Sequence, residues 1–85
     1  MEDKVHVLAI LGDESRIRIL NVIADKEWSV SDLAAQARMH VACTSHHLQV
    51  LKKSGIVESR RDGNTIYYSL GHNAFVKKIL ALTLK

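Results

Sequence analysis

The sequence predicts a small, mainly helical domain that carries one β-hairpin. Apolar residues recur at helical spacing through most of the 85 residues, and the chain contains no proline. Two β-prone runs flank the turn sequence Asp62-Gly63-Asn64. Because no linker, repeat or low-complexity stretch is visible, we expect residues 1–85 to form a single domain.

The first helix is predicted over residues 3–11, where apolar residues occupy more than one face. Gly12 interrupts this run, and either Asp13 or Ser15 is suited to cap the second helix. The buried stripe of the second helix is expected to consist of Ile17, Leu20, Ile23 and Ala24.

Two further helices are separated by only a few residues. After a short extended piece at Trp28-Ser29-Val30, Ser31 is expected to cap a helix that ends near Arg38. The next helix is predicted from about Ala42 to Lys53, followed by Gly55 as the left-handed residue after its end. So short a connection between helices is typical of a helix-turn-helix.

The C-terminal part is predicted to contain the hairpin and one more helix. Residues 56–61 and 65–70 form the strands, with Ile66, Tyr68 and Leu70 facing the core. Asn73 is suited to cap the last helix. Two apolar stripes run along that helix, one with Phe75, Ile79 and Leu82 and the other with Val76, Leu80 and Leu84.

The helix at residues 42–53 presents a face suited to read DNA bases. Its buried stripe is expected to be Thr44, Leu48 and Leu51. The residues that then project outward are Ala42, Ser45, His46 and Gln49, and none of them is acidic. A major groove admits one α-helix, and a glutamine can bond adenine through two hydrogen bonds.

Phosphate contacts are expected from the same helix and from the hairpin. The helix offers Thr44, Ser45, Lys52 and Lys53, and the hairpin offers Arg60, Arg61 and Asn64 as a basic wing. Taken singly, these residues have simpler explanations: the lysines suit the negative end of a helix dipole, and the arginines suit a solvent-exposed edge strand. Together and in this order, these features favour a winged helix-turn-helix that binds double-stranded DNA.

Four stretches of the chain carry a further signal: 11–20 (LGDESRIRIL), 31–34 (SDLA), 45–57 (SHHLQVLKKSGIV) and 60–70 (RRDGNTIYYSL). Together they resemble the ArsR/SmtB family of bacterial regulators. The resemblance implies a homodimeric repressor that binds an inverted-repeat operator, with the first and last helices as its interface. The surplus apolar faces of those helices agree, and the expected interface residues are Val5, Leu8, Phe75, Val76, Ile79 and Leu80. The alternative is a monomer in which the two helices pack on each other.

The family's metal ligands have no counterparts here, so we expect no metal and no other cofactor. Ser29 and Ser31 stand where metal sensors carry a Cys-x-Cys motif, and Gly71 and Asn73 stand at the first ligand pair of the last helix. A site between His6 and His72 across a dimer stays open. Cys43, the only cysteine, is suited to packing or to oxidation.

Composition narrows the remaining possibilities. Hydrophobic residues make up 47% and charged residues 25%, and the net charge of +3 permits a polyanionic partner. Since no secretory leader or long apolar run is visible, we expect a cytoplasmic protein without a membrane segment. No catalytic constellation is recognisable, so an enzyme is not expected. The alternatives are a repressor with an atypical effector site and a winged helix that binds other proteins.

Overall fold

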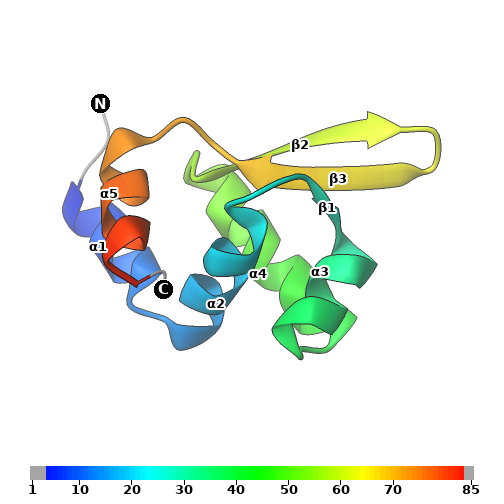
Figure 1. The fold of residues 1–85 in the computed structure, drawn as a ribbon, viewed down its shortest axis with the longest axis horizontal. Helices are drawn as coiled ribbons and strands as arrows, with labels where there is room; N and C mark the ends of the chain where they lie inside the picture. The colour runs from blue at the N-terminus through cyan, green and yellow to red at the C-terminus, as the bar shows by residue number, and fades with distance from the viewer. Residues whose placement is uncertain (1–3, 84–85) are drawn as a thin grey trace.

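A computed structural model describes residues 4–83, which form five helices and a three-stranded antiparallel sheet (Figure 1). The elements are α1 (Lys4–Leu11), α2 (Glu14–Ile23), β1 (Trp28–Ser29), α3 (Val30–Ala37), α4 (Val41–Lys53), β2 (Val57–Asp62), β3 (Thr65–Leu70) and α5 (Ala74–Thr83). Their order agrees with the sequence prediction. The short extended piece at residues 28–29 is a third strand of the sheet, so the hairpin is not isolated.

Asp13, rather than Ser15, caps helix α2. Its Oδ1 accepts hydrogen bonds from the backbone N–H groups of Ser15 at 2.8 Å and Arg16 at 3.3 Å. Desolvation raises the pKa of the Asp13 carboxyl, but the hydrogen bonds from these two N–H groups and the nearby Arg16 charge lower it by more, so the net shift is downward. The cap therefore favours a charged carboxylate at the positive end of the helix.

The caps of α3 and α5 show one wrong and one correct prediction. Ser29, not Ser31, caps α3, because its Oγ accepts from the backbone N–H of Asp32 at 3.3 Å. The helix begins earlier than predicted since Ser29 ends strand β1 in an extended conformation. Asn73 caps α5 as predicted, with its Oδ1 accepting from the N–H of Val76 at 3.1 Å.

The sheet has the strand order β1-β3-β2, and its register sets which side chains share a face. Trp28 is paired with Tyr68, and Arg61 is paired with Ile66. Tyr68 is buried against the helices, but Ile66 is 38% exposed, so its predicted place in the core is wrong. Ile66 lies near the tip of a hairpin that extends beyond the helices (Figure 1), where it borders an open hollow that also contains Val30 and Ser31 at the start of α3.

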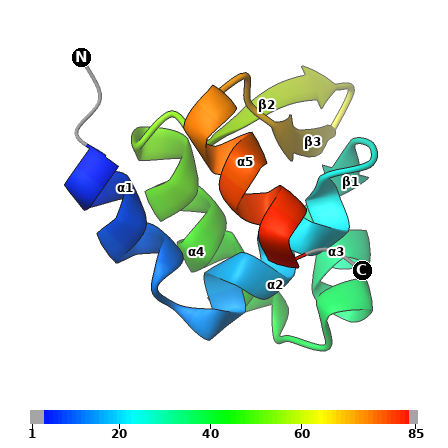
Figure 2. The same cartoon turned by 60° about the vertical axis from the view of Figure 1, so that its left-hand side comes forward.

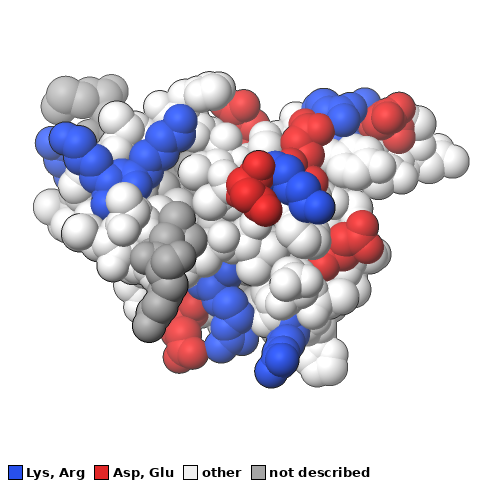
Figure 3. Space-filling view, viewed as in Figure 1, with Lys and Arg blue, Asp and Glu red and all other residues white. Residues whose placement is uncertain are grey.

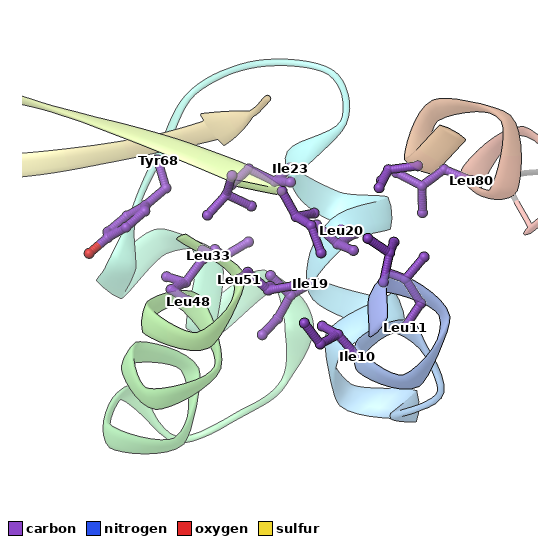
Figure 4. Close-up of a cluster of buried hydrophobic side chains, with 14 residues drawn as sticks. Ile10, Leu11, Ile19, Leu20, Ile23, Leu33, Leu48, Leu51, Tyr68 and Leu80 are labelled. Carbon is purple, nitrogen blue, oxygen red and sulfur yellow. The ribbon is translucent and has the colours of Figure 1, made fainter. Parts of the chain in front are cut away.

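The core lies where α2, α3 and α4 meet the base of the sheet (Figure 4). Its central side chains are Ile19, Leu20, Ile23, Leu33, Leu48, Leu51 and Ile56, all at most 1% exposed. Full burial of each such side chain contributes about 1.5–3 kcal/mol. Leu48 and Leu51 thereby fix the rotation of α4 about its own axis, which decides which residues it presents to solvent.

Helices α1 and α5 divide their apolar residues between the core and the surface. Val76 and Leu80 are at most 2% exposed, so their predicted place in a dimer interface is wrong: they pack in the core of the protomer. Val5 and Leu8 are 73% and 48% exposed. Phe75 and Ile79 are partly buried, and Leu82 is exposed. Leu84 lies outside the described residues.

Candidate nucleic-acid interface

A tight turn over residues 38–40 joins α3 to α4. Arg38 adopts the left-handed conformation with φ 60°, and its N–H donates to the carbonyl of Ala35 at 3.2 Å. The N–H of Met39 donates to the carbonyl of Ala34 at 2.9 Å. These bonds satisfy the last carbonyls of α3 and turn the chain directly into α4. The result is a helix-turn-helix in which α4 is the second helix.

Helix α4 presents the predicted polar face. Ala42, His46 and Gln49 are exposed and Ser45 is partly exposed, whereas Leu48 and Leu51 on the opposite side are fully buried. No acidic side chain occurs in the helix, and Lys52 and Lys53 lie in its last turn. A negatively charged groove would meet no like charge along this face.

Thr44 does not belong to this exposed face. Its side chain is 0% exposed, and its hydroxyl donates to the carbonyl of His40 at 2.9 Å. The prediction that Thr44 contacts phosphate is therefore wrong. The sequence placed Thr44 in the buried stripe and also near the helix start, and the burial excludes the second role for its side chain.

An open hollow lies between the end of α4 and the sheet. The hollow has a volume of about 380 Å³ and is lined by Gln49, Lys52, Lys53 and Tyr68. Both lysines are exposed. Two ammonium groups beside the outward face of α4 create a positive potential where a phosphate backbone would pass.

The two arginines of the wing lie on opposite faces of the sheet. Arg60 Nε donates to both carboxylate oxygens of Glu27, at 2.9 and 2.7 Å, and its guanidinium carbon lies 5.1 Å from the centroid of the Tyr67 ring. Arg61 is exposed and shares the face of its register partner Ile66 and of Tyr68. Tyr68 faces the hollow beside α4, so Arg61 projects from the same side of the hairpin as that hollow.

Glu27 is a residue that the sequence analysis missed. The hydrogen bond from Arg60 lowers the pKa of the Glu27 carboxyl, and the same bond raises the pKa of Arg60. Arg60 therefore has an acidic partner within the protomer, which distinguishes it from Arg61. Only the register of β1 beside β3 brings Glu27 and Arg60 together, and a two-residue strand gives almost no sequence signal.

Charges of both signs mix on the face of the molecule that Figure 3 shows. Lysine and arginine side chains gather at the end formed by α1 and α5, while acidic and basic side chains alternate near β1 and along the hairpin. This face therefore carries no continuous basic surface. Beside the polar face of α4, the positive groups are Lys52 and Lys53 at the end of the helix and Arg61 on the wing.

The histidines of α4 have different surroundings. The ring centroids of His46 and His47 are 5.9 Å apart, and His47 accepts a hydrogen bond from Arg16 while His46 is exposed. Within residues 4–83, no three His, Cys, Asp or Glu side chains are grouped to hold a metal ion. Cys43 is exposed in the first turn of α4. No helix in the described part of the chain is long and apolar enough to cross a membrane.

Comparison with known proteins identifies the family. The family model of bacterial regulatory proteins of the arsR family matches residues 13–59. The chain belongs to the ArsR family. The ArsR match runs from the cap of α2 into strand β2, so it includes the whole helix-turn-helix and the beginning of the first strand of the wing.

Relatives with known sequences and structures extend this ArsR assignment to most of the chain. The cadmium resistance transcriptional regulatory protein CadC of Listeria innocua is 42% identical over 76 residues, covering 88% of this chain and 59% of CadC. The structure of reduced HlyU from Vibrio cholerae has a TM-score of 0.85 at 30% identity, covering 93% of this chain and 82% of that one.

A third similar ArsR-type structure is described as a homodimeric winged helix-turn-helix DNA-binding domain. This domain, Mb0332 from Mycobacterium bovis, has a TM-score of 0.80 at 33% identity and covers 93% of this chain and 72% of that one. The chain spans about half to three fifths of the length of the first relatives it matches, from 48% to 59%. The likenesses show that the fold is a winged helix-turn-helix.

Proposed function

We propose that this ArsR-family protein is a sequence-specific, DNA-binding transcriptional regulator that acts in the cytoplasm as a homodimer. The observation that carries the proposal is the outward face of α4, which is exposed, polar and free of acidic residues, beside two lysines and a basic wing. A winged helix that binds other proteins has no need of this combination.

In this proposal α4 lies in a major groove and reads base edges. Gln49, His46 and Ser45 supply hydrogen bonds, and Ala42 contacts apolar base edges such as a thymine methyl group. Each good contact of this kind discriminates against a wrong base by about 1–3 kcal/mol. Gln49 is central because it is exposed beside the hollow that also contains Lys52 and Lys53.

Phosphate groups are bound by the remaining basic and polar residues. Lys52 and Lys53 flank the groove, and Arg61 and Asn64 approach the backbone from the wing. Arg60 is assigned a different role, because its guanidinium is bonded to Glu27 on the other face of the sheet. It braces the wing against the segment that precedes β1.

The dimer is proposed to form through the exposed parts of α1 and α5. Val5 and Leu8 offer apolar surface that the protomer leaves uncovered, and Phe75 and Ile79 are only partly buried. The homodimeric state named for the Mycobacterium bovis domain supports this assignment. A twofold dimer places two copies of α4 in successive major grooves, about 34 Å apart.

The resemblance to the ArsR family supports repression as the effect on transcription. The target is proposed to be an inverted repeat, since a twofold dimer presents the same reading surface twice. We propose no metal site. The alternative within this proposal is a repressor that responds to an effector at an atypical site. It would bind DNA through the same surface.

Selection of binding sites from random duplexes tests this function. Purified protein is expected to enrich an inverted repeat whose half-sites lie about ten base pairs apart. Affinity for the recovered site is expected to fall steeply with salt, because each neutralised phosphate releases counterions. Recovery of no enriched sequence would contradict the proposal, and salt-insensitive binding to a protein would favour the protein-interaction alternative.

A further inference from the structure

Arg16 connects three helices through its side chain. It lies in the first turn of α2, where its backbone N–H is bonded to the capping carboxylate of Asp13. Its Nη1 donates to the carbonyl of Ile10 near the end of α1 at 3.3 Å. Its Nε donates to Nδ1 of His47 in α4, also at 3.3 Å. Figure 2 shows α1 and α4 with α2 at their lower ends.

Both acceptors of the Arg16 side chain, the carbonyl of Ile10 and Nδ1 of His47, gain a hydrogen-bond donor. The carbonyl of Ile10 is among the last four of α1, which have no partner within the helix. A cation at that end is also favoured by the helix dipole. His47 is partly buried on the flank of α4, and its Nδ1 accepts the bond when the ring proton is on Nε2.

The guanidinium is suited to hold the two helices in one arrangement. Its donors lie in a rigid plane, so two bonds made by one arginine restrict the angle between their acceptors more than a flexible ammonium would. Both acceptors belong to helices with assigned surfaces, because α1 carries the exposed Val5 and Leu8 and α4 carries the base-reading face.

We propose that Arg16 is a positioning residue that sets the orientation of α4 relative to α1. This inference rests on the proposed function, in which α1 contacts the partner protomer and α4 enters the DNA. In such a dimer, the angle between α1 and α4 decides how far apart the two reading helices lie. Arg16 thereby determines the half-site spacing that the dimer accepts, without contacting a base.

The distance between the two copies of α4 can be measured without DNA. Cys43 is the only cysteine in the chain and is exposed in the first turn of α4. A spin label on this residue reports the distribution of distances between the two helices in the intact homodimer. We expect a single narrow distribution for the wild type and a broader or shifted one for Arg16→Gln and for His47→Phe.

Two variants serve as controls. Arg18→Gln removes the same charge from the same helix, but the hydrogen bonds of Arg18 go to Glu14 and to the carbonyl of Ala37 at the end of α3. It is expected to leave the distribution narrow. His47→Gln keeps an acceptor for Arg16 and is expected to restore most of the wild-type distribution, whereas a loss of packing alone would affect it as much as His47→Phe.

A second readout uses the selected operator with its half-sites moved one base pair closer or farther apart. The wild type is expected to lose affinity sharply on both changes. Arg16→Gln is expected to tolerate them better by about tenfold, which is the size of an ordinary coupling between contacting residues. The effects of Arg16→Gln and His47→Phe are expected to be less than additive, because both remove the same bond.

The outcomes separate this inference from the proposed function. If an operator is selected but Arg16→Gln changes neither the distance distribution nor the spacing tolerance, the positioning role is refuted and the function stands. If Arg16→Gln broadens the distribution but no operator is selected, the positioning role stands and the function fails. A monomer, which yields no distance between labels, would refute the inference because it requires two copies of α4.

Discussion

The two arginines of the wing are adjacent in sequence but are expected to contribute differently to DNA binding. Arg61 projects from the face of the hairpin that adjoins α4, so Arg61→Ala is expected to remove a phosphate contact. Arg60 is bonded to Glu27 on the other face, so Arg60→Ala is expected to remove none. The pair forms a matched comparison of charge and position.

The expected magnitude follows from counterion release. Each phosphate contact contributes about 0.9 to the slope of log affinity against log salt, so a homodimer that loses two contacts has a slope shallower by about 1.8. Between about 50 and 200 mM salt, this difference changes the ratio of wild-type to variant affinity by about twelvefold. Arg61→Ala is expected to show this change on the operator and on an unrelated duplex alike.

Fluorescence anisotropy with both duplexes over that salt range measures the slopes directly. The assignment predicts a shallower slope for Arg61→Ala and a wild-type slope for Arg60→Ala. Equal slopes for Arg61→Ala and the wild type would refute the placement of Arg61 on the DNA. A larger effect from Arg60→Ala would show that Arg60 leaves Glu27 and binds phosphate itself.

Three further predictions concern the buried hydroxyl, the apolar surface and the wing pair. Thr44→Val is expected to cost at most about 1 kcal/mol in the free energy of unfolding and to leave operator affinity unchanged, because the carbonyl of His40 keeps the backbone bond from residue 44. A clear loss of affinity would restore Thr44 as a DNA contact. Leu8→Lys is expected to raise the dimer dissociation constant, measured by sedimentation, by about a hundredfold or more, since burying an unpaired ammonium costs several kcal/mol. An unchanged dissociation constant would show that α1 is not part of the interface. Glu27→Gln is expected to lower the melting temperature slightly at neutral pH. Because the folded-state pKa of Glu27 is lowered from 4.5, the difference between variant and wild type is present above that value and disappears as the pH falls through the lowered pKa. A difference that persists in acid would exclude the ion pair with Arg60 as its cause.

The elements of the fold were largely predictable because their signals are local. Helical spacing of Leu48 and Leu51, together with Gly55 after the helix end, placed α4 and its outward face correctly. The cap of α3 was misplaced by two residues, because Ser29 and Ser31 both suit the role and only the extended backbone of β1 decides between them. Ile66 was misplaced because alternation along a strand does not reveal how far the strand extends beyond the core.

The parts of the candidate site that sequence did not predict depend on contacts between distant residues. The bond of Arg60 to Glu27 spans the width of the sheet, and the bond of Arg16 to His47 joins two helices. Both bonds follow from tertiary packing and carry no periodicity or spacing. The two apolar stripes of α5 were recognised, but the sequence does not say which stripe faces the protomer's own core, and the structure assigns Val76 and Leu80 to it.

The most direct test of the central claim is a pair of binding-site selections, one with the wild type and one with Gln49→Ala. If the outward face of α4 reads bases, the variant is expected to recover the same inverted repeat with preference lost at one symmetrically related position in each half-site, at a cost of about 1–3 kcal/mol per lost contact. Recovery of an identical motif with identical preferences by both proteins would contradict the assignment of α4 as the reading helix.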